Sequence, residues 1–205
     1  MKTPFISRGK HFLTVAAAIG LSLSLTNCKK DKDDNNNNST PTVTQQDPLS
    51  GYLSATGFNQ AMSQTVNGYD YEFGIKFIPA VNGKMTAIVT KIPDVNANMK
   101  VTIWDAATMT ILRTELVQVT SSGVDITKNI TPLELTAGTE YMISMNSNDW
   151  YSHSRTDASD ATYPVAVQDI SITGYAFYSG ADQVYPDTPI SSYYAGDLSF
   201  KFQKN

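Results

Sequence analysis

Alternation of apolar and polar residues with a period of two recurs along this chain and most limits how it can fold. It is clearest at Leu198, Phe200 and Phe202, which fall on one face of an extended segment. Asn-Gly, Ser-Gly and Pro turn signals separate such runs, and no long stretch has the 3.6-residue repeat of an amphipathic helix. Strands are predicted at residues 72–78, 84–92, 99–105, 111–119, 124–135 (one or two strands), 139–145, 170–178 and 195–202.

Short strands separated by turns, without helix-length segments between them, are typical of antiparallel packing in two layers. The prediction is therefore an all-β fold, an antiparallel β-sandwich. A jelly-roll-like connection is expected, with an immunoglobulin-like one as the alternative. Val81-Asn82-Gly83 is expected to form a hairpin-type turn, because Asn-Gly tolerates the positive φ angles of such turns.

The N-terminal region has the composition of an export signal. Residues 12–28 read FLTVAAAIGLSLSLTNC, follow Lys2, Arg8 and Lys10, and end at the only cysteine, Cys28. The apolar run is shorter than the roughly 20 residues that a membrane-spanning helix needs. An uncleaved membrane helix and a cleaved signal that leaves a free thiol are the two alternatives.

The end of this segment, Leu25-Thr26-Asn27-Cys28, resembles the lipobox of bacterial lipoproteins. It departs from that pattern at Asn27, where Gly, Ala or Ser is usual. The resemblance implies that Cys28 is acylated and that the membrane is a partner through this lipid anchor. The charged residues 29–34 resemble the export signal of surface lipoproteins of Bacteroidota, which implies the outer membrane and the cell surface, with a periplasm-facing orientation as the alternative.

Composition divides the chain into three parts. Residues 1–27 are the predicted signal peptide, residues 28–48 a lipidated cysteine with a flexible polar tether, and residues 49–205 a single β-sandwich domain. Residues 50–205 hold nine Lys or Arg and fifteen Asp or Glu, and 9 − 15 gives a net charge of −6. This charge argues against nucleic acid and anionic lipid headgroups as partners.

Four sequence features follow one another in the middle of the chain: FGIKF at residues 73–77, Gly83, VTIWD at residues 101–105 and PLELTAGTEY at residues 132–141. Together they resemble a family of uncharacterised bacterial β-sandwich modules found in exported, often multidomain proteins. The resemblance covers residues 71–151. It implies a sandwich fold and an extracellular accessory role, and it supplies no catalytic residues.

Catalytic chemistry has little support in the sequence. After the leader only His153 remains, in a polar stretch that predicts an exposed loop, and no G-x-S-x-G motif surrounds a serine. We therefore predict no enzyme activity, no catalytic residues, no metal ligands and no cofactor. A structural Ca²⁺ held by loop carboxylates is the alternative; the acids available for it are Asp157, Asp160, Asp182, Asp187 and Asp197.

Carbohydrate binding is the function that the residues favour. An exposed aromatic ring can stack on the apolar face of a pyranose while amide, carboxylate and guanidinium groups bind its hydroxyls. The candidate ligand-binding residues lie in a predicted polar loop that runs to about Pro164, and they are Asn148, Asp149, Trp150, Tyr151 and Arg155. The alternative is that Trp150 or Tyr151 folds back as a lid on the core.

The prediction for the whole chain is a lipid-anchored, exported, non-enzymatic binding or adhesion module. Its expected ligand is a glycan. The alternative is a structural or protein-interaction module whose partner is a protein of the cell envelope. Several tyrosines near the C-terminus fit either a contact surface or strand packing; they are Tyr175, Tyr178, Tyr185, Tyr193 and Tyr194.

Overall fold

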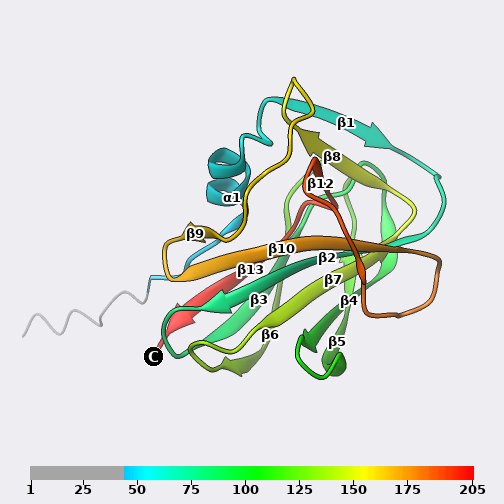
Figure 1. Ribbon diagram of the computed structural model, residues 1–205. Coiled ribbons are helices and arrows are strands. Elements are labelled where there is room, and N and C mark those ends of the chain that lie inside the picture. The colour runs from blue at the N-terminus through cyan, green and yellow to red at the C-terminus, as the bar shows by residue number, and fades with distance from the viewer. Residues whose placement is uncertain (1–43) are drawn as a thin grey trace, which may run out of the picture. The chain divides into compact units, whose positions relative to one another are not determined.

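The computed structural model describes residues 44–205 (Figure 1). The predicted signal peptide (residues 1–27), the predicted acylation site Cys28 and the predicted tether up to residue 43 lie outside these described residues. The elements of the described part, in chain order, are α1 (Leu49–Thr56), β1 (Ala61–Thr65), β2 (Tyr71–Pro79), β3 (Gly83–Thr90), β4 (Asn96–Asp105), β5 (Thr110–Val119), β6 (Ile126–Leu135), β7 (Tyr141–Ser147), β8 (Trp150–Ser154), β9 (Val165–Val167), β10 (Ile170–Ser179), β11 (Thr188–Pro189), β12 (Tyr193–Ala195) and β13 (Leu198–Lys204).

These strands form three sheets, and every pair of named strands is antiparallel. The long sheet has the order β11-β10-β2-β7-β4-β5, with β9 also paired to β10. The small sheet has the order β1-β8-β12, and the third sheet has the order β13-β3-β6. The predicted all-β antiparallel sandwich is therefore confirmed.

Each predicted strand has a counterpart in the fold, but the predicted hairpin at Val81-Asn82-Gly83 is wrong. β2 belongs to the long sheet and β3 to the third sheet, so this connection crosses between layers instead of joining paired strands. Gly83 is required for another reason. A Cβ atom at Gly83 would lie 2.4 Å from the Phe202 ring and 2.6 Å from the Gln203 carbonyl oxygen, because β13 passes directly against it.

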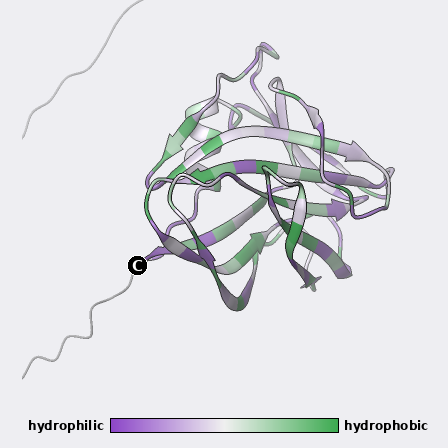
Figure 2. Ribbon diagram, turned by 60° about the horizontal axis from the view of Figure 1, so that its bottom comes forward, coloured by the Kyte–Doolittle hydropathy of each residue, from purple (hydrophilic) through white to green (hydrophobic). Residues whose placement is uncertain are grey.

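The core lies between the inner faces of the sheets, where alternate residues of each strand point. In β2 these are Phe73, Ile75 and Phe77, and in β13 they include Phe200. The rings of Phe77 and Phe200 lie 4.5 Å apart between their centroids and join the long sheet to the third sheet. Hydrophilic and hydrophobic residues alternate along the strands (Figure 2), as the period-two pattern requires.

Helix α1 is the one helix among the described residues, and it lies beside β9 (Figure 1). Leu49, Tyr52, Leu53 and Thr56 have the spacing of one helix face, and Tyr52 and Thr56 are buried. The helix ends at Gly57, whose φ of 75° is the left-handed conformation that glycine adopts without strain. The burial of Tyr52 attaches the N-terminal end of the fold to the core.

Two residues that the sequence analysis assigns to the tether are attached to the last strand. The backbone N–H of Gln46 donates to the carbonyl of Phe202 at 2.7 Å, and the N–H of Phe202 donates back at 2.9 Å. The Asp47 carboxylate accepts from the Lys201 ammonium at 2.9 Å. Gln46 and Asp47 therefore pack as part of the folded domain, ahead of residue 49.

Phe77→Ala tests the packing between layers. We expect the free energy of unfolding to fall by about 3–5 kcal/mol, because the substitution leaves a cavity where Phe77 is fully buried. Denaturant unfolding followed by circular dichroism measures this. Tyr69→Ala is the control, since Tyr69 is 83% exposed and its loss should change stability by no more than about 0.5 kcal/mol. Equal, small effects of both substitutions would contradict the assigned core.

Candidate functional site

An open cleft of about 380 Å³ lies where the small sheet meets the inner face of the long sheet. We call it the aromatic cleft, because most of its lining comes from aromatic rings. The residues that line it are Thr65 of β1, Tyr71 and Phe73 of β2, Trp150 and Ser152 of β8, Phe177 of β10, and Tyr193 and Ala195 of β12.

Strand register brings these residues together from distant parts of the chain. Phe73 lies opposite Phe177 in the β2–β10 pair, and Thr65 lies opposite Trp150 in the β1–β8 pair. Ser152 lies opposite Ala195 in the β8–β12 pair. Since side chains alternate along a strand, residues spaced by two in β2, β8 and β12 face the same cleft.

Aromatic contacts fix the half-buried Trp150 ring at the centre of this wall. Its ring centroid lies 5.3 Å from that of Tyr71, with the planes at 76°, and 5.1 Å from that of Phe73. Tyr71 also lies 5.9 Å from Phe177 in an edge-to-face arrangement. Such contacts favour defined ring orientations, so the aromatic surface is preformed.

The polar groups of the aromatic cleft are available to a ligand. Within residues 44–205, the side-chain hydrogen bonds use neither the Trp150 indole N–H nor the hydroxyls of Tyr71 and Tyr193. Burial, and secondarily the nearby Tyr71 hydroxyl, raises the pKa of Tyr193, so its hydroxyl stays protonated and can donate. No lining residue carries a charge at neutral pH. The cleft therefore suits a neutral ligand with both apolar faces and hydroxyl groups.

Of the five residues that the sequence nominates, only Trp150 lines this cleft. Tyr151 points to the opposite face of β8, where it is buried and the Lys91 ammonium lies 5.3 Å from its ring centroid. The predicted long polar loop is wrong at this point, because residues 150–154 form β8 and pair with both neighbours. Strand alternation separates the two adjacent aromatic residues.

The other three nominated residues hold local structure. The Asn148 carbonyl accepts the Gly68 N–H at 2.8 Å, and the buried Asp149 carboxylate accepts the Asn67 N–H at 2.6 Å. The Arg155 guanidinium donates to the backbone carbonyls of Thr56 and Asp160, each at 2.6 Å. These contacts connect β8 to the β1–β2 turn and to α1.

His153 is not the exposed loop residue that the sequence predicts. It lies within β8, is buried, and its Nε2 bonds to the Asp197 carboxylate. The pair lines a second cleft of about 300 Å³, and Asp197 is also 3.5 Å from the Lys91 ammonium. Asp47, in the same lining, is paired with Lys201. The charged groups of this second cleft therefore largely satisfy one another.

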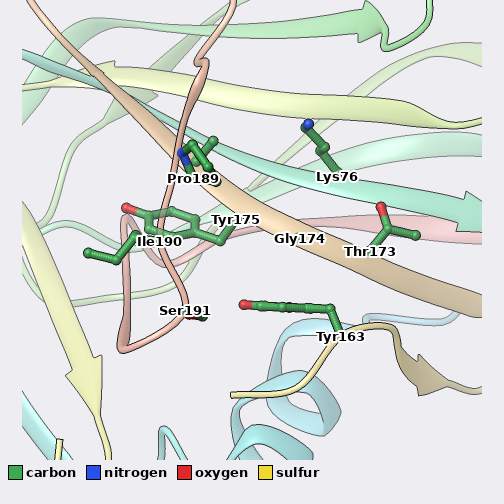
Figure 3. A pocket seen from close by; sticks show the side chains of 9 residues that line it. Lys76, Tyr163, Thr173, Gly174, Tyr175, Pro189, Ile190 and Ser191 are labelled. Carbon is green, nitrogen blue, oxygen red and sulfur yellow. The ribbon is translucent and has the colours of Figure 1, made fainter. Parts of the chain in front are cut away.

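A third cleft, of about 340 Å³, opens at the edge of the long sheet where β9 and β11 leave part of β10 uncovered. Tyr163 and Ser191 face it from one side, and Lys76 from the other (Figure 3). The Tyr175 hydroxyl in its lining has no hydrogen-bond partner in the described part of the chain but is buried away from the surface, and the hydroxyls of Tyr163 and Ser191 are already engaged. That of Tyr163 bonds to the Tyr52 hydroxyl at 2.6 Å, and that of Ser191 donates to Asp160 at 2.9 Å. The aromatic cleft is thus the better candidate.

The loop carboxylates named above as alternative calcium ligands do not form one cluster. Asp157 accepts from the N–H and hydroxyl of Ser159, bonds that lower the pKa of Asp157. Asp160 accepts from Ser191, and Asp197 pairs with His153. Within the part of the chain that the structure describes, no three His, Cys, Asp or Glu side chains are grouped so as to hold a metal ion.

The sequence does not predict most residues of the aromatic cleft. Phe73 lies in a predicted strand and Tyr193 in the tyrosine-rich C-terminal region, but no sequence signal places either beside Trp150. The pairing of β2 with β10 and of β8 with β12 connects residues far apart in the chain. Only the strand order reveals the cleft.

Fold and site together define an all-β sandwich with a preformed, uncharged aromatic cleft. The chain belongs to the family described as a domain of unknown function, DUF4082, whose model matches residues 58–195. That span contains every residue of the aromatic cleft. The comparison with curated proteins finds no match for the chain.

Gly68→Ala tests the geometry of the cleft without removing an aromatic ring. The new Cβ would lie 2.9 Å from Trp150 Cη2 and 2.8 Å from Thr65 Cγ2, so the indole ring must shift. We expect the Trp150 indole N–H resonance to move in a ¹H–¹⁵N spectrum while that of Trp104 stays. Gly174→Ala is the matched control, because a Cβ there meets no atom within 4 Å. An unmoved Trp150 resonance would contradict the assigned packing.

Proposed function

We propose that this chain is an exported, lipid-anchored, non-enzymatic binding module whose aromatic cleft holds a carbohydrate. The observation that carries the proposal is the convergence of five aromatic side chains with unengaged polar groups and no charge. The aromatic residues are Tyr71, Phe73, Trp150, Phe177 and Tyr193.

Sugar rings match this lining chemically. The C–H faces of a pyranose are apolar and stack on exposed indole and phenol rings. Its hydroxyls can accept from the Trp150 N–H and exchange hydrogen bonds with the hydroxyls of Tyr71, Tyr193, Ser152 and Thr65. A cleft of about 380 Å³ lies within the usual range for small-ligand sites. The absence of charge in the lining favours neutral over acidic sugars.

The lining also supports binding over catalysis. It contains no histidine, carboxylate or thiol, the groups that most often act as general acid, general base or nucleophile. His153 lies on the other side of β8 and is engaged by Asp197. The cleft thus offers contact surface and hydrogen bonds to a bound molecule.

The proposal of a lipid anchor is based on the sequence of the predicted signal peptide and on Cys28. We place the chain at the outer membrane, displayed on the cell surface, with a periplasm-facing orientation as the second candidate. Among residues 44–205, no helix combines the length and apolar character needed to cross a membrane. Attachment by acyl chains requires no such helix.

Edge strand β5 favours a second candidate function, binding of an envelope protein. Ile111, Leu112 and Leu116 are exposed on it, and β5 ends the long sheet. Side chains connect β5 to β6 of the third sheet, since Lys128 donates to Glu115 at 2.7 Å and to the Leu116 carbonyl at 2.9 Å. Exposed apolar side chains on an unpaired edge are typical of protein contacts.

Aromatic substitution tests the carbohydrate proposal. On a glycan array and in calorimetry with the full-length chain in mild detergent, we expect Trp150→Ala to weaken binding at least about tenfold, or 1.4 kcal/mol, since stacking is lost. Tyr193→Ala should weaken it in the same direction. Tyr69→Ala and Tyr151→Phe are the controls, since neither side chain lines the cleft, and both should bind as the unmodified chain does.

Two outcomes would overturn this assignment. An array without any bound glycan removes carbohydrate as the ligand. Binding that survives Trp150→Ala and Tyr193→Ala places the ligand elsewhere on the molecule. Co-purification of a stoichiometric envelope protein, lost on charge substitution at Leu116, would favour the second candidate.

Cys28→Ala tests the lipid anchor. We expect this variant to leave the membrane fraction for the soluble fraction, because acyl chains would no longer hold it. Fractionation followed by immunoblotting measures this. Asn27→Ala is the control, since it keeps the cysteine and should remain attached. A Cys28→Ala protein that stays with the membranes would show that something else holds it there.

A further inference from the structure

The segment between β10 and β11, residues 180–187, crosses the outer face of the long sheet, opposite the face that forms the core; we call it the strap. It starts at Gly180, whose N–H donates to the Asp70 carbonyl at 2.9 Å and whose carbonyl accepts from the Asn146 side chain at 3.1 Å. In Figure 1 it descends after β10 and then turns upward toward β12. The strap thus covers strands that precede it by many residues.

Side-chain contacts hold the middle of the strap. The Gln183 amide donates to the Thr102 hydroxyl of β4 at 2.9 Å and to the Thr114 hydroxyl of β5 at 2.6 Å. The Tyr185 ring packs edge-to-face on Trp104, with 5.7 Å between centroids. Apart from Gly180, these contacts come from side chains and not from a strand ladder, so the strap can separate from the sheet without breaking strand pairing.

Buried on this outer face is Glu72 of β2, which has no solvent-exposed surface. Its Oε1 accepts from the Ser144 hydroxyl at 2.5 Å, and Ser144 accepts from the Trp104 indole N–H at 2.8 Å. Its Oε2 has no hydrogen-bond partner among the described residues. The network therefore leads from Glu72 to Trp104, the side chain on which the strap packs.

Few nearby groups stabilise the negative charge of an ionised Glu72 carboxylate. Across the strand pairs, Tyr178 of β10 and Asn146 of β7 lie beside it, and Lys100 of β4 lies one strand further. The strap carries Asp182, Tyr185 and Asp187 and no cation. Burial raises the pKa of Glu72 from 4.5 to about 7, although Ser144, Asn146 and Lys100 oppose the shift.

We propose that Glu72 and the strap form a pH-responsive cover, in which loss of the Glu72 proton opens the strap and hydrates the carboxylate. A buried carboxylate with one unpartnered oxygen is stable when protonated and unfavourable when charged. Opening of the strap exposes the Glu72 carboxylate to water. This inference concerns the outer face and does not depend on a carbohydrate in the aromatic cleft.

The direction of the pH effect follows from linkage. With the strap closed, Glu72 holds its proton up to about pH 7; when exposed, it loses the proton near pH 4.5. The closed state is therefore most favoured below pH 4.5, and its advantage falls as the pH rises toward 7. The opening equilibrium constant should rise by up to about tenfold per pH unit in this window and level off above it.

Hydrogen exchange at two bonded N–H groups tests the proposal on the full-length chain: the Gly180 amide, which donates to the Asp70 carbonyl, and the Trp104 indole N–H beneath the strap, which donates to Ser144. Their exchange is measured by nuclear magnetic resonance from pH 5 to 8 and corrected for the chemical exchange rate at each pH. We expect the corrected opening constant to rise until about pH 7 and then level off. In Glu72→Gln it should be independent of pH, because the side chain cannot ionise.

Two further variants keep the test decisive. Asp182→Asn removes a strap carboxylate and should keep the pH dependence of the unmodified chain. Ser144→Ala removes the hydroxyl that stabilises ionised Glu72, so the opening constant should level off at a higher pH. This variant takes the place of Glu72→Gln if Glu72→Gln does not fold. A flat profile in the unmodified chain, or an unchanged slope in Glu72→Gln, would overturn the proposal.

Discussion

The packing of the small sheet on the aromatic side chains of the long sheet is the contact on which the rest of this structure depends. Tyr194 of β12 packs edge-to-face on Tyr175 of β10 at 5.3 Å, and Trp150 of β8 packs on Phe73 of β2. The corner after β12 also reaches the third sheet, since the Lys91 N–H donates to the Asp197 carbonyl at 3.1 Å. The three sheets thus meet along β8 and β12, and both neighbouring clefts owe their shape to that meeting.

The same contact explains why one face of β8 is available to a ligand and the other is not. Tyr151 and His153 lie on the face of β8 opposite Trp150, where Lys91 and Asp197 engage them. Trp150 and Ser152 line the aromatic cleft, and both are only partly buried. A half-buried indole keeps part of its apolar surface in water, and a stacked ligand would remove that surface from water. Binding affinity would come from this burial.

Sequence periodicity predicts much of this fold, because a strand with one buried face alternates wherever it lies. It correctly predicts the strands around Phe73 and Phe200, which are β2 and β13. It failed at β8, where Trp150-Tyr151-Ser152-His153 has large side chains on both faces and so no apolar-polar alternation. It failed for α1 because Gly51 and two serines obscure a helix face only two turns long. The cleft could not be predicted, since it depends on which distant strands pair.

Side chains of β2 lie on both faces of the long sheet, and its strand pairing separates the aromatic cleft on one face from the strap on the other. Tyr71 and Phe73 face the aromatic cleft, and Glu72 between them faces the strap. Ladders to β10 and β7 hold the β2 backbone on both sides at these positions. A charge that appears on Glu72 therefore acts on the side chains above it more readily than on the β2 backbone. Strap opening and ligand binding can then vary independently, although one strand carries the residues for both.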